Sequence, residues 1–332
     1  MCLILFAWKS HPDYPLVVAA NRDEFYERDT EGLGWWPEHP HVLAGRDRAD
    51  VLGSPGTWLG FTKTGRFAAL TNVRAPSEKN PDARTRGELS LMYLTKNDRP
   101  NDFIQSHSKR FSQYNGFNLL MADLSDPENA EMHWVSNRMM MGQSIRPRKV
   151  FPEQALAPGV YGLSNAMLDT PWPKVNHRVA AFAQALAMDQ GQLKNADQYL
   201  KLLSDTHVAS DHELPNTGVN KDWEKALSSA FIKTPSYGTR SSTLLRIRKD
   251  GQFEMVERRF DATGTVGHEV RLCLRLLGLG NGVAHVGGHA PADPLGPHPA
   301  DGVGDTDGLH RGGHHVEPQA RHAHRLAQPA QG

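Results

Sequence analysis

The sequence is poor in cysteine and has no excess charge of either sign. Its 332 residues include only two cysteines, Cys2 and Cys273, which lie far apart in the chain. So few and so widely separated thiols exclude a disulfide-stabilised fold and are typical of a reducing cytosol. Lysine plus arginine equals aspartate plus glutamate, at 37 each, so no net field favours nucleic acid or an anionic membrane surface. The expected partners are therefore small molecules or proteins, and not nucleic acid.

Long apolar runs are also missing. The first apolar run, residues 2–8, has no basic region before it and is shorter than a typical signal-peptide core. No other run approaches the roughly 18 to 20 apolar residues of a membrane span. We therefore expect a cytoplasmic protein without a membrane span.

Short apolar segments separated by turn residues are what the sequence has instead. Residues 2–8 and 16–20 are near-continuously apolar, which predicts two strands buried on both faces and joined as a central hairpin. By the same criteria, further strands are expected over residues 57–61, 66–72, 117–123, 130–135, 160–163, 242–249, 252–260 and 268–276. Helical spacing predicts helices over 84–96, 100–111, 175–186, 196–204 and 222–229. Residues 29–56 are rich in Gly, Pro and charge without a visible period, so we expect a long loop there.

The order of these elements points to one class of fold. Strands and helices follow one another in groups, without the regular βαβ alternation of a parallel Rossmann-like sheet. We predict an α+β fold, a four-layer αββα sandwich in which two mostly antiparallel sheets stack between two helical layers.

The composition changes abruptly near residue 277. The last 55 residues hold 12 Gly, 8 His and 6 Pro, and no Lys, Ile, Phe, Trp or Tyr. Such a segment cannot bury enough apolar surface to offset its chain entropy. We predict a folded domain over residues 1–276 and a disordered low-complexity tail over 277–332. Histidines at short spacing chelate transition metals, but flexible His-rich tracts also bind added metal without a biological role. A third alternative is that the segment is not authentic coding sequence, because GC-rich DNA read out of frame gives a similar amino-acid composition. We assign no metal site.

Cys2 has the most distinctive chemistry in the chain because it follows the initiator Met1. A small penultimate side chain generally permits removal of that methionine, which leaves Cys2 with a free α-amine of pKa about 7.7 to 8.0. A thiol and a weak base on the same residue are the least that an N-terminal nucleophile hydrolase needs, because the amine can accept the thiol proton. The alternative is that Cys2 is only a small apolar residue at the start of a strand.

Candidate partners for this nucleophile occur at the ends of predicted strands. Arg22 favours a thiolate by its charge, and Asp23 can orient an α-amine. Asn72 and Asn165 can donate hydrogen bonds to an oxyanion without changing protonation state. Arg240 precedes another strand and supplies a second guanidinium. Each residue also has a structural interpretation as a turn cap, a strand exit or a surface charge, and only a fold that brings them together makes a site.

Seven short motifs follow one another in order between residue 1 and about residue 276. They are Met1-Cys2, Asn21-Arg22-Asp23-Glu24, Gly56-Thr57-Trp58-Leu59-Gly60, Thr71-Asn72-Val73-Arg74, Asn115-Gly116-Phe117-Asn118-Leu119-Leu120, Gly162-Leu163-Ser164-Asn165-Ala166 and Thr239-Arg240-Ser241-Ser242-Thr243. Together they resemble the NRDE family, also called the transport and Golgi organization protein 2 family. The resemblance implies an N-terminal-nucleophile-hydrolase-like αββα sandwich.

The pattern is also similar to that of more distant cysteine amidohydrolases, which act on penicillin V and conjugated bile salts. Those enzymes place Arg, Asp, two Asn and a second Arg around an N-terminal Cys. By order, these residues map onto Arg22, Asp23, Asn72, Asn165 and Arg240. The distant enzymes separate the first Arg and Asp by two residues, whereas here the two are adjacent.

The resemblance leaves two classes of function open. The first is an N-terminal cysteine hydrolase that cleaves a small amide or ester through Cys2 and needs no cofactor. In the amide case the bond cleaved is a carbon–nitrogen bond other than a peptide bond. Eukaryotic members are associated with Golgi organisation and with haem or acyl-CoA lipid handling. The second class is therefore a non-catalytic carrier of haem or an acyl lipid, or an interaction protein in trafficking. An apolar ligand replaces the amide or ester substrate in the carrier interpretation.

Overall fold

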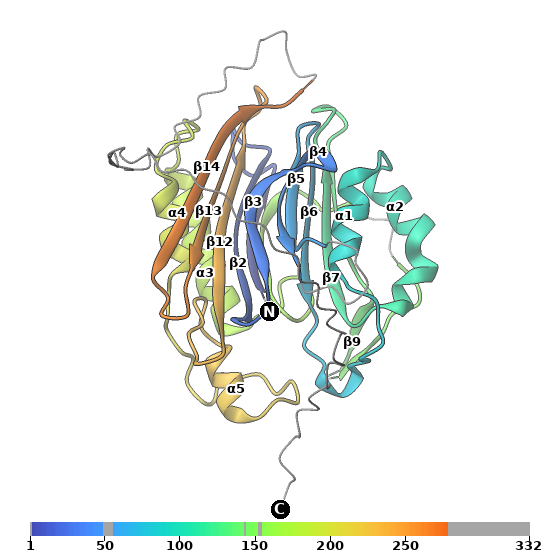
Figure 1. Cartoon of the computed structure of the whole chain (residues 1–332), viewed down its shortest axis with the longest axis vertical. Coiled ribbons are helices and arrows are strands. Elements are labelled where there is room, and N and C mark those ends of the chain that lie inside the picture. Colours follow the sequence, from blue (N-terminus) through green and yellow to red (C-terminus); the bar gives the residue numbers. More distant parts are fainter. Residues whose placement is uncertain (1, 49–55, 143, 152–154, 278–332) are drawn as a thin grey trace, which may run out of the picture. The chain divides into compact units, whose positions relative to one another are not determined.

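Two six-stranded sheets, named here sheet A and sheet B, form the centre of the fold (Figure 1). The computed structural model describes residues 2–48, 56–142, 144–151 and 155–277. All paired strands within both sheets are antiparallel. Sheet A has the order β11 (Gly159–Leu163), β1 (Cys2–Trp8), β2 (Leu16–Phe25), β12 (Tyr237–Ile247), β13 (Gln252–Phe260) and β14 (Val266–Arg275). Sheet B has the order β3 (Thr30–Trp36), β4 (His39–Asp47), β5 (Leu59–Thr62), β6 (Arg66–Asn72), β7 (Phe117–Asp123) and β8 (Glu131–Ser136).

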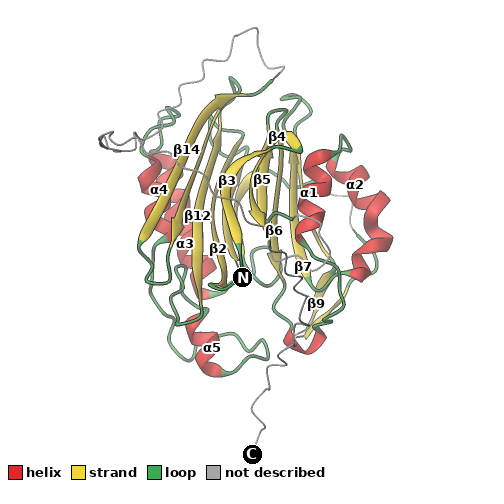
Figure 2. Ribbon diagram, viewed as in Figure 1, coloured by secondary structure: helices red, strands yellow, loops and turns green. Residues whose placement is uncertain are grey.

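Helices cover the outer face of each sheet (Figure 2). On sheet A these are α3 (Pro173–Met188) and α4 (Ala196–Leu203), which bury Phe182 and Tyr199 against the alternate residues of β1 and β2. On sheet B they are α1 (Gly87–Thr95) and α2 (Pro100–His107), which is followed by a 3₁₀ turn (Ser108–Gln113). The shorter elements are α5 (Lys221–Ala226), a 3₁₀ turn (Pro76–Glu78) and a hairpin of β9 (Arg138–Met141) and β10 (Ser144–Pro147). The predicted four-layer αββα sandwich is confirmed.

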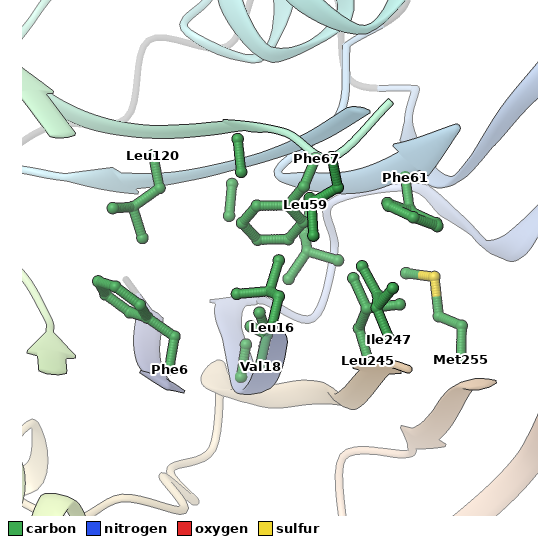
Figure 3. Packing of buried hydrophobic residues seen from close by; sticks show 14 of the residues in the cluster. Phe6, Leu16, Val18, Leu59, Phe61, Phe67, Leu120, Leu245, Ile247 and Met255 are labelled. Atoms are coloured by element: carbon green, nitrogen blue, oxygen red, sulfur yellow. The ribbon is translucent and has the colours of Figure 1, made fainter. Parts of the chain in front are cut away.

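The main core lies between the two sheets. Figure 3 shows Phe6 and Val18 of sheet A facing Phe67 and Leu120 of sheet B, and all four are fully buried. Side chains of a strand alternate between its two faces. Even-numbered residues of β1 and β2 therefore point between the sheets, and odd-numbered residues point toward α3 and α4. This alternation decides where the polar residues at the strand ends lie.

The predicted long loop over residues 29–56 is wrong, because most of it forms the hairpin of β3 and β4. The glycines of this hairpin misled the prediction, since they lie within its strands, and Gly45 is required there by close packing. A Cβ atom on Gly45 would lie 2.3 Å from the Trp58 ring. The hairpin β9–β10 was not predicted either, and residues 49–55 lie outside the described part of the chain.

Two polar motifs also lie inside strands where strand ends were expected. The segment Asn21–Glu24 continues β2, and Arg240 lies within β12. The two segments pair with each other, so each supplies the hydrogen bonds that keep the other extended. The local sequence pattern could not predict this pairing, because the two segments are far apart in the sequence.

The predicted tail, residues 277–332, lies outside the described residues apart from Leu277, so the predicted domain boundary stays a prediction. None of the described helices combines the length and the apolar character that crossing a bilayer demands.

The core between the sheets should dominate stability. Replacing Phe67, which is fully buried, with Ala should lower the free energy of unfolding by about 3 to 5 kcal/mol. The control Met141→Ala removes a side chain that is 60% exposed and should change it by less than about 0.5 kcal/mol. Urea denaturation measures both values, and equal effects would contradict this account of the core.

Candidate functional site

A cavity of about 510 Å³ opens where β1 begins and where β2, β4 and β6 end. Its volume is that of a small-molecule site. It is lined by Cys2, Arg22, Asp23, Glu24, Arg28, Asp47, Thr57, Trp58, Leu70, Asn72, Pro81, Asp82, Ala83, Arg84, Thr85, Arg86, Gly87 and Asn115. Four of the six predicted catalytic residues are therefore on its wall: Cys2, Arg22, Asp23 and Asn72.

Cys2 and Arg22 are directly opposite each other in the pairing of β1 with β2. Both have even numbers, so both side chains point to the face between the sheets. The Arg22 guanidinium is 5% exposed and lies 4.3 Å from the centre of the Trp58 ring. It also lies 3.6 Å from the carboxylate of Asp47, while its Nη1 atom has no hydrogen-bond partner among the described residues. The pairing thus holds a buried cation beside the thiol.

The electrostatics of the Cys2 thiol are dominated by burial, which raises its pKa. The Asp23 carboxylate raises this pKa further, whereas Arg22 and a backbone hydrogen bond from Asp23 lower it. The thiol is therefore protonated at neutral pH, and a base must remove its proton during any nucleophilic attack.

Asp23 points to the opposite face of β2 from Arg22, as adjacent residues of a strand must. Its Oδ1 accepts a hydrogen bond from the Thr239 hydroxyl at 2.7 Å, and its backbone carbonyl accepts one from the Tyr237 hydroxyl at 2.9 Å. The carboxylate is almost fully buried, and burial raises its pKa. Its predicted role in orienting the α-amine stays a prediction.

Lys174 is a residue of this region that the sequence did not reveal. It lies in the first turn of α3, is 5% exposed, and its Nζ has no hydrogen-bond partner among the described residues. Burial lowers its pKa to about 8, and the charge of Asp23 opposes this shift. In the sequence Lys174 is a single lysine at the start of a helix, and no feature of the neighbouring residues indicates that its side chain is buried.

Asn72 and Asn165 are brought together, but they have different surroundings. Asn72 lines the cavity, and its side-chain amide makes no hydrogen bond to a described residue. Asn165 is fully buried outside the cavity wall and donates a hydrogen bond from Nδ2 to the Asn72 carbonyl at 2.9 Å. Asn165 therefore fixes the end of the strand that carries Asn72. Its direct contact with an oxyanion stays a prediction.

Arg240 does not line the cavity. It lies at a β-bulge of β12, and its Nη1 donates to the backbone carbonyls of Phe25, Tyr26 and Arg28 at 2.9, 3.1 and 3.2 Å. These contacts hold the turn that follows β2. The structure thus places Arg240 behind the site, where it supports the chain segment next to Arg22.

The described residues offer poor ligands for haem or a metal ion. No group of three or more His, Cys, Asp or Glu side chains in this part of the chain is arranged to hold a metal. Among the described residues that line the cavity there is no histidine, and burial disfavours the thiolate form of Cys2 that would ligate iron. The histidines of the predicted tail lie outside the described residues.

The fold is a four-layer αββα sandwich with a cavity at the ends of its central strands. A family model described as Transport and Golgi organisation 2 matches residues 1–262, so the chain belongs to that family. This confirms the resemblance drawn from the motifs.

Two relatives of similar sequence agree with this assignment. The chain is 34% identical over 290 residues to the Transport and Golgi organization protein 2 homolog of Bos taurus, covering 82% of this chain and 99% of that one. It is 33% identical over 269 residues to the homolog of Homo sapiens, covering 78% and 92%. Among solved structures, a mutant of conjugated bile acid hydrolase from Clostridium perfringens aligns with a TM-score of 0.37 and 8% identity, over 82% of this chain and 92% of that one.

The raised pKa of Cys2 predicts slow alkylation at neutral pH. In a Cys273→Ala variant, the reaction of Cys2 with iodoacetamide should reach half its maximal rate at a pH above that of free cysteine. Arg22→Gln should move this midpoint still higher, because Arg22 favours the thiolate. The control Arg240→Gln should leave it unchanged. A midpoint at or below that of free cysteine would contradict the effect of burial.

The buried Lys174 predicts a dependence of stability on pH. Its pKa is lowered from 10.5 to about 8 in the folded protein, so the unfolded chain binds the proton more tightly between these values and stability rises with pH across this window. Relative to Lys174→Met, the wild-type free energy of unfolding should increase by on the order of 2 kcal/mol from the bottom to the top of the window. Denaturant titrations at several pH values measure this, and parallel pH profiles would show that Lys174 is not buried as a cation.

Proposed function

We propose that this protein is an N-terminal cysteine hydrolase that cleaves a small amide or ester through Cys2. The observation that carries the proposal is the placement of Cys2, Arg22 and Asn72 on the wall of one small-molecule-sized cavity. A nucleophile, a cation and a neutral amide donor are the groups that acyl transfer needs. Removal of Met1, which exposes the α-amine of Cys2, is part of the proposal.

In the proposed first step, the α-amine of Cys2 accepts the thiol proton as sulfur attacks the substrate carbonyl. The carbon–oxygen double bond becomes a single bond, and the oxyanion accepts a hydrogen bond from the Asn72 amide. Collapse of this intermediate breaks the bond to the leaving amine or alcohol, which takes the proton from the α-ammonium. Water then attacks the thioester by the same sequence and releases the acid, which restores Cys2.

The surrounding residues have supporting roles in this scheme. Arg22 stabilises negative charge on sulfur and on the intermediate, because it is the buried cation directly opposite Cys2. Asn165 positions Asn72 through its hydrogen bond to the Asn72 carbonyl. Arg240 holds the turn behind Arg22.

Acyl transfer is tested by trapping the acyl-enzyme. Intact-mass analysis of the purified protein should show loss of Met1, and an activated acyl ester should add one acyl group to Cys2. Cys2→Ala should abolish this adduct, whereas Cys273→Ala, which removes the other thiol, should keep it. Asn72→Ala should slow acylation by about 100- to 1000-fold, the usual cost of removing an oxyanion donor.

Two results would overturn the hydrolase proposal. The first is retention of Met1 in the protein isolated from its own host, because the α-amine is then on another residue. The second is an acylation rate that does not change in Asn72→Ala, which would mean that Cys2 reacts only as an ordinary thiol.

A carrier of an apolar ligand is the second candidate, and a separate cavity favours it. This cavity of about 410 Å³ is lined mainly by apolar side chains, including Leu124, Pro127, Ile247 and Leu276. Haem fits it poorly, because both ring nitrogens of its His11 already have hydrogen-bond partners. An acyl lipid is the better ligand class for this cavity. Its affinity would be unchanged in Cys2→Ala, which separates carrier from hydrolase. The trafficking interpretation stays a prediction.

A further inference from the structure

Arginines line the cavity in unusual number, and most of their charge is neutralised. Arg28 pairs with Asp47 at 2.9 Å. Arg84 donates two hydrogen bonds to Glu88, at 2.6 and 2.8 Å. These guanidiniums are held by carboxylates of the protein itself, so neither is available to bind a ligand strongly.

Arg86 is different. Its guanidinium donates to the backbone carbonyl of Gly116 at 3.2 Å, and no described carboxylate lies within ion-pair distance of it. Arg86 is partly buried, and burial lowers its pKa to about 10, which leaves it charged at neutral pH. Arg86 lines the same cavity as Cys2. The cavity therefore holds a cation without a protein counter-ion in the described part of the chain.

Two further groups that line the cavity favour an anion. Arg86 is the N-cap residue of α1 and provides no side-chain cap, so the positive end of this nine-residue helix is at the cavity wall, where Gly87 also lies. Independently, Nη1 of the 5% exposed Arg22 has no hydrogen-bond partner among the described residues. A buried guanidinium nitrogen without a partner is costly unless a ligand satisfies it.

We propose that this cavity binds small molecules that carry a carboxylate, with Arg86 as the residue that recognises that group. A guanidinium forms two parallel hydrogen bonds to a carboxylate, and such charge-assisted bonds are strong in a partly buried site. One unpaired cation complements one negative charge, which favours a carboxylate over a doubly charged phosphate. The assignment rests on the proposed function, since it makes the hydrolase substrate an acidic amide or ester.

The rim of the cavity supplies an opposing charge. Asp82 lines the cavity, is exposed, and forms no ion pair with a described residue. A carboxylate at this position repels an acidic ligand weakly, because solvent screens it. Its removal should therefore strengthen binding, an effect opposite to that of removing Arg86.

The test is binding of three probes of equal chain length, octanoate, octanamide and octyl phosphate, by calorimetry to the full-length protein with Cys2→Ala. Octanamide is itself a small amide, but without the Cys2 thiol it cannot be cleaved, so the result is independent of Cys2 acylation and either proposal can fail alone. Octanoate should bind about 10- to 100-fold more tightly than octanamide, as expected for a charged hydrogen bond. Octyl phosphate should bind more weakly than octanoate.

Variants identify the residue responsible. Arg86→Gln should reduce the preference for octanoate over octanamide to less than about threefold, with octanamide affinity unchanged. Arg84→Gln removes the same charge from the same cavity, but from an arginine already paired with Glu88, and should keep the preference. Asp82→Asn should tighten octanoate binding by about twofold. Thermal unfolding checks that each variant is folded.

Several outcomes would overturn the assignment. Equal affinities for octanoate and octanamide while Arg86 is present, or no binding of either at millimolar concentration, would mean that the cavity does not select an anion. If Arg84→Gln loses the preference for octanoate as Arg86→Gln does, the preference depends on the net charge of the cavity and not on Arg86 in particular. Tighter binding of octyl phosphate than of octanoate would exclude the carboxylate as the preferred group.

Discussion

The pairing of β1 with β2 is the constraint on which the rest of the site depends. It sets Cys2 opposite Arg22 at one end of two inner strands of sheet A, and the register is fixed because both strands are buried on both faces. A slip by one residue would exchange the face of every side chain and place apolar residues against the wrong layer. The packing of apolar side chains across the four layers thus determines where the Cys2 thiol lies relative to the Arg22 guanidinium, although those apolar residues take no part in the chemistry of the thiol.

The same alternation divides the Asn21–Glu24 motif into two functions. Arg22 and Glu24 face the cavity between the sheets. Asn21 faces the helical layer, where its Nδ2 donates to the carbonyls of Leu203 and Ala230, both at 2.8 Å. One half of the motif therefore tethers the covering layer to the central strand, and the other half presents charge to the site. The bonds of Asn21 thus support the fold independently of any chemistry at Cys2.

Polar contacts also connect the two sheets at the site. The Ser164 hydroxyl donates to the carbonyl of Cys2 at 3.0 Å, and the Thr71 hydroxyl donates to the carbonyl of Ser164 at 2.6 Å. With the bond from Asn165 to Asn72, they join the beginning of β1 in sheet A to the end of β6 in sheet B. These bonds tie the part of the cavity wall that carries Cys2 to the part that carries Asn72.

The sequence by itself determined the layers of this protein, the limits of strands such as β1 and β6, and the identity of Cys2, Arg22 and Asn72 as candidates. It could do so because apolar periodicity and strand ends are local properties of the chain. Only the tertiary structure decided that β3 and β4 are strands, that Arg240 supports a turn behind the site, and that Lys174 is buried. It also decided that Arg84 has a carboxylate partner while Arg86 has none among the residues that the structure describes. These facts depend on which distant segments become neighbours in the fold. Whether a residue is buried or ion-paired is decided by the residues that surround it in space, and the local sequence does not specify them.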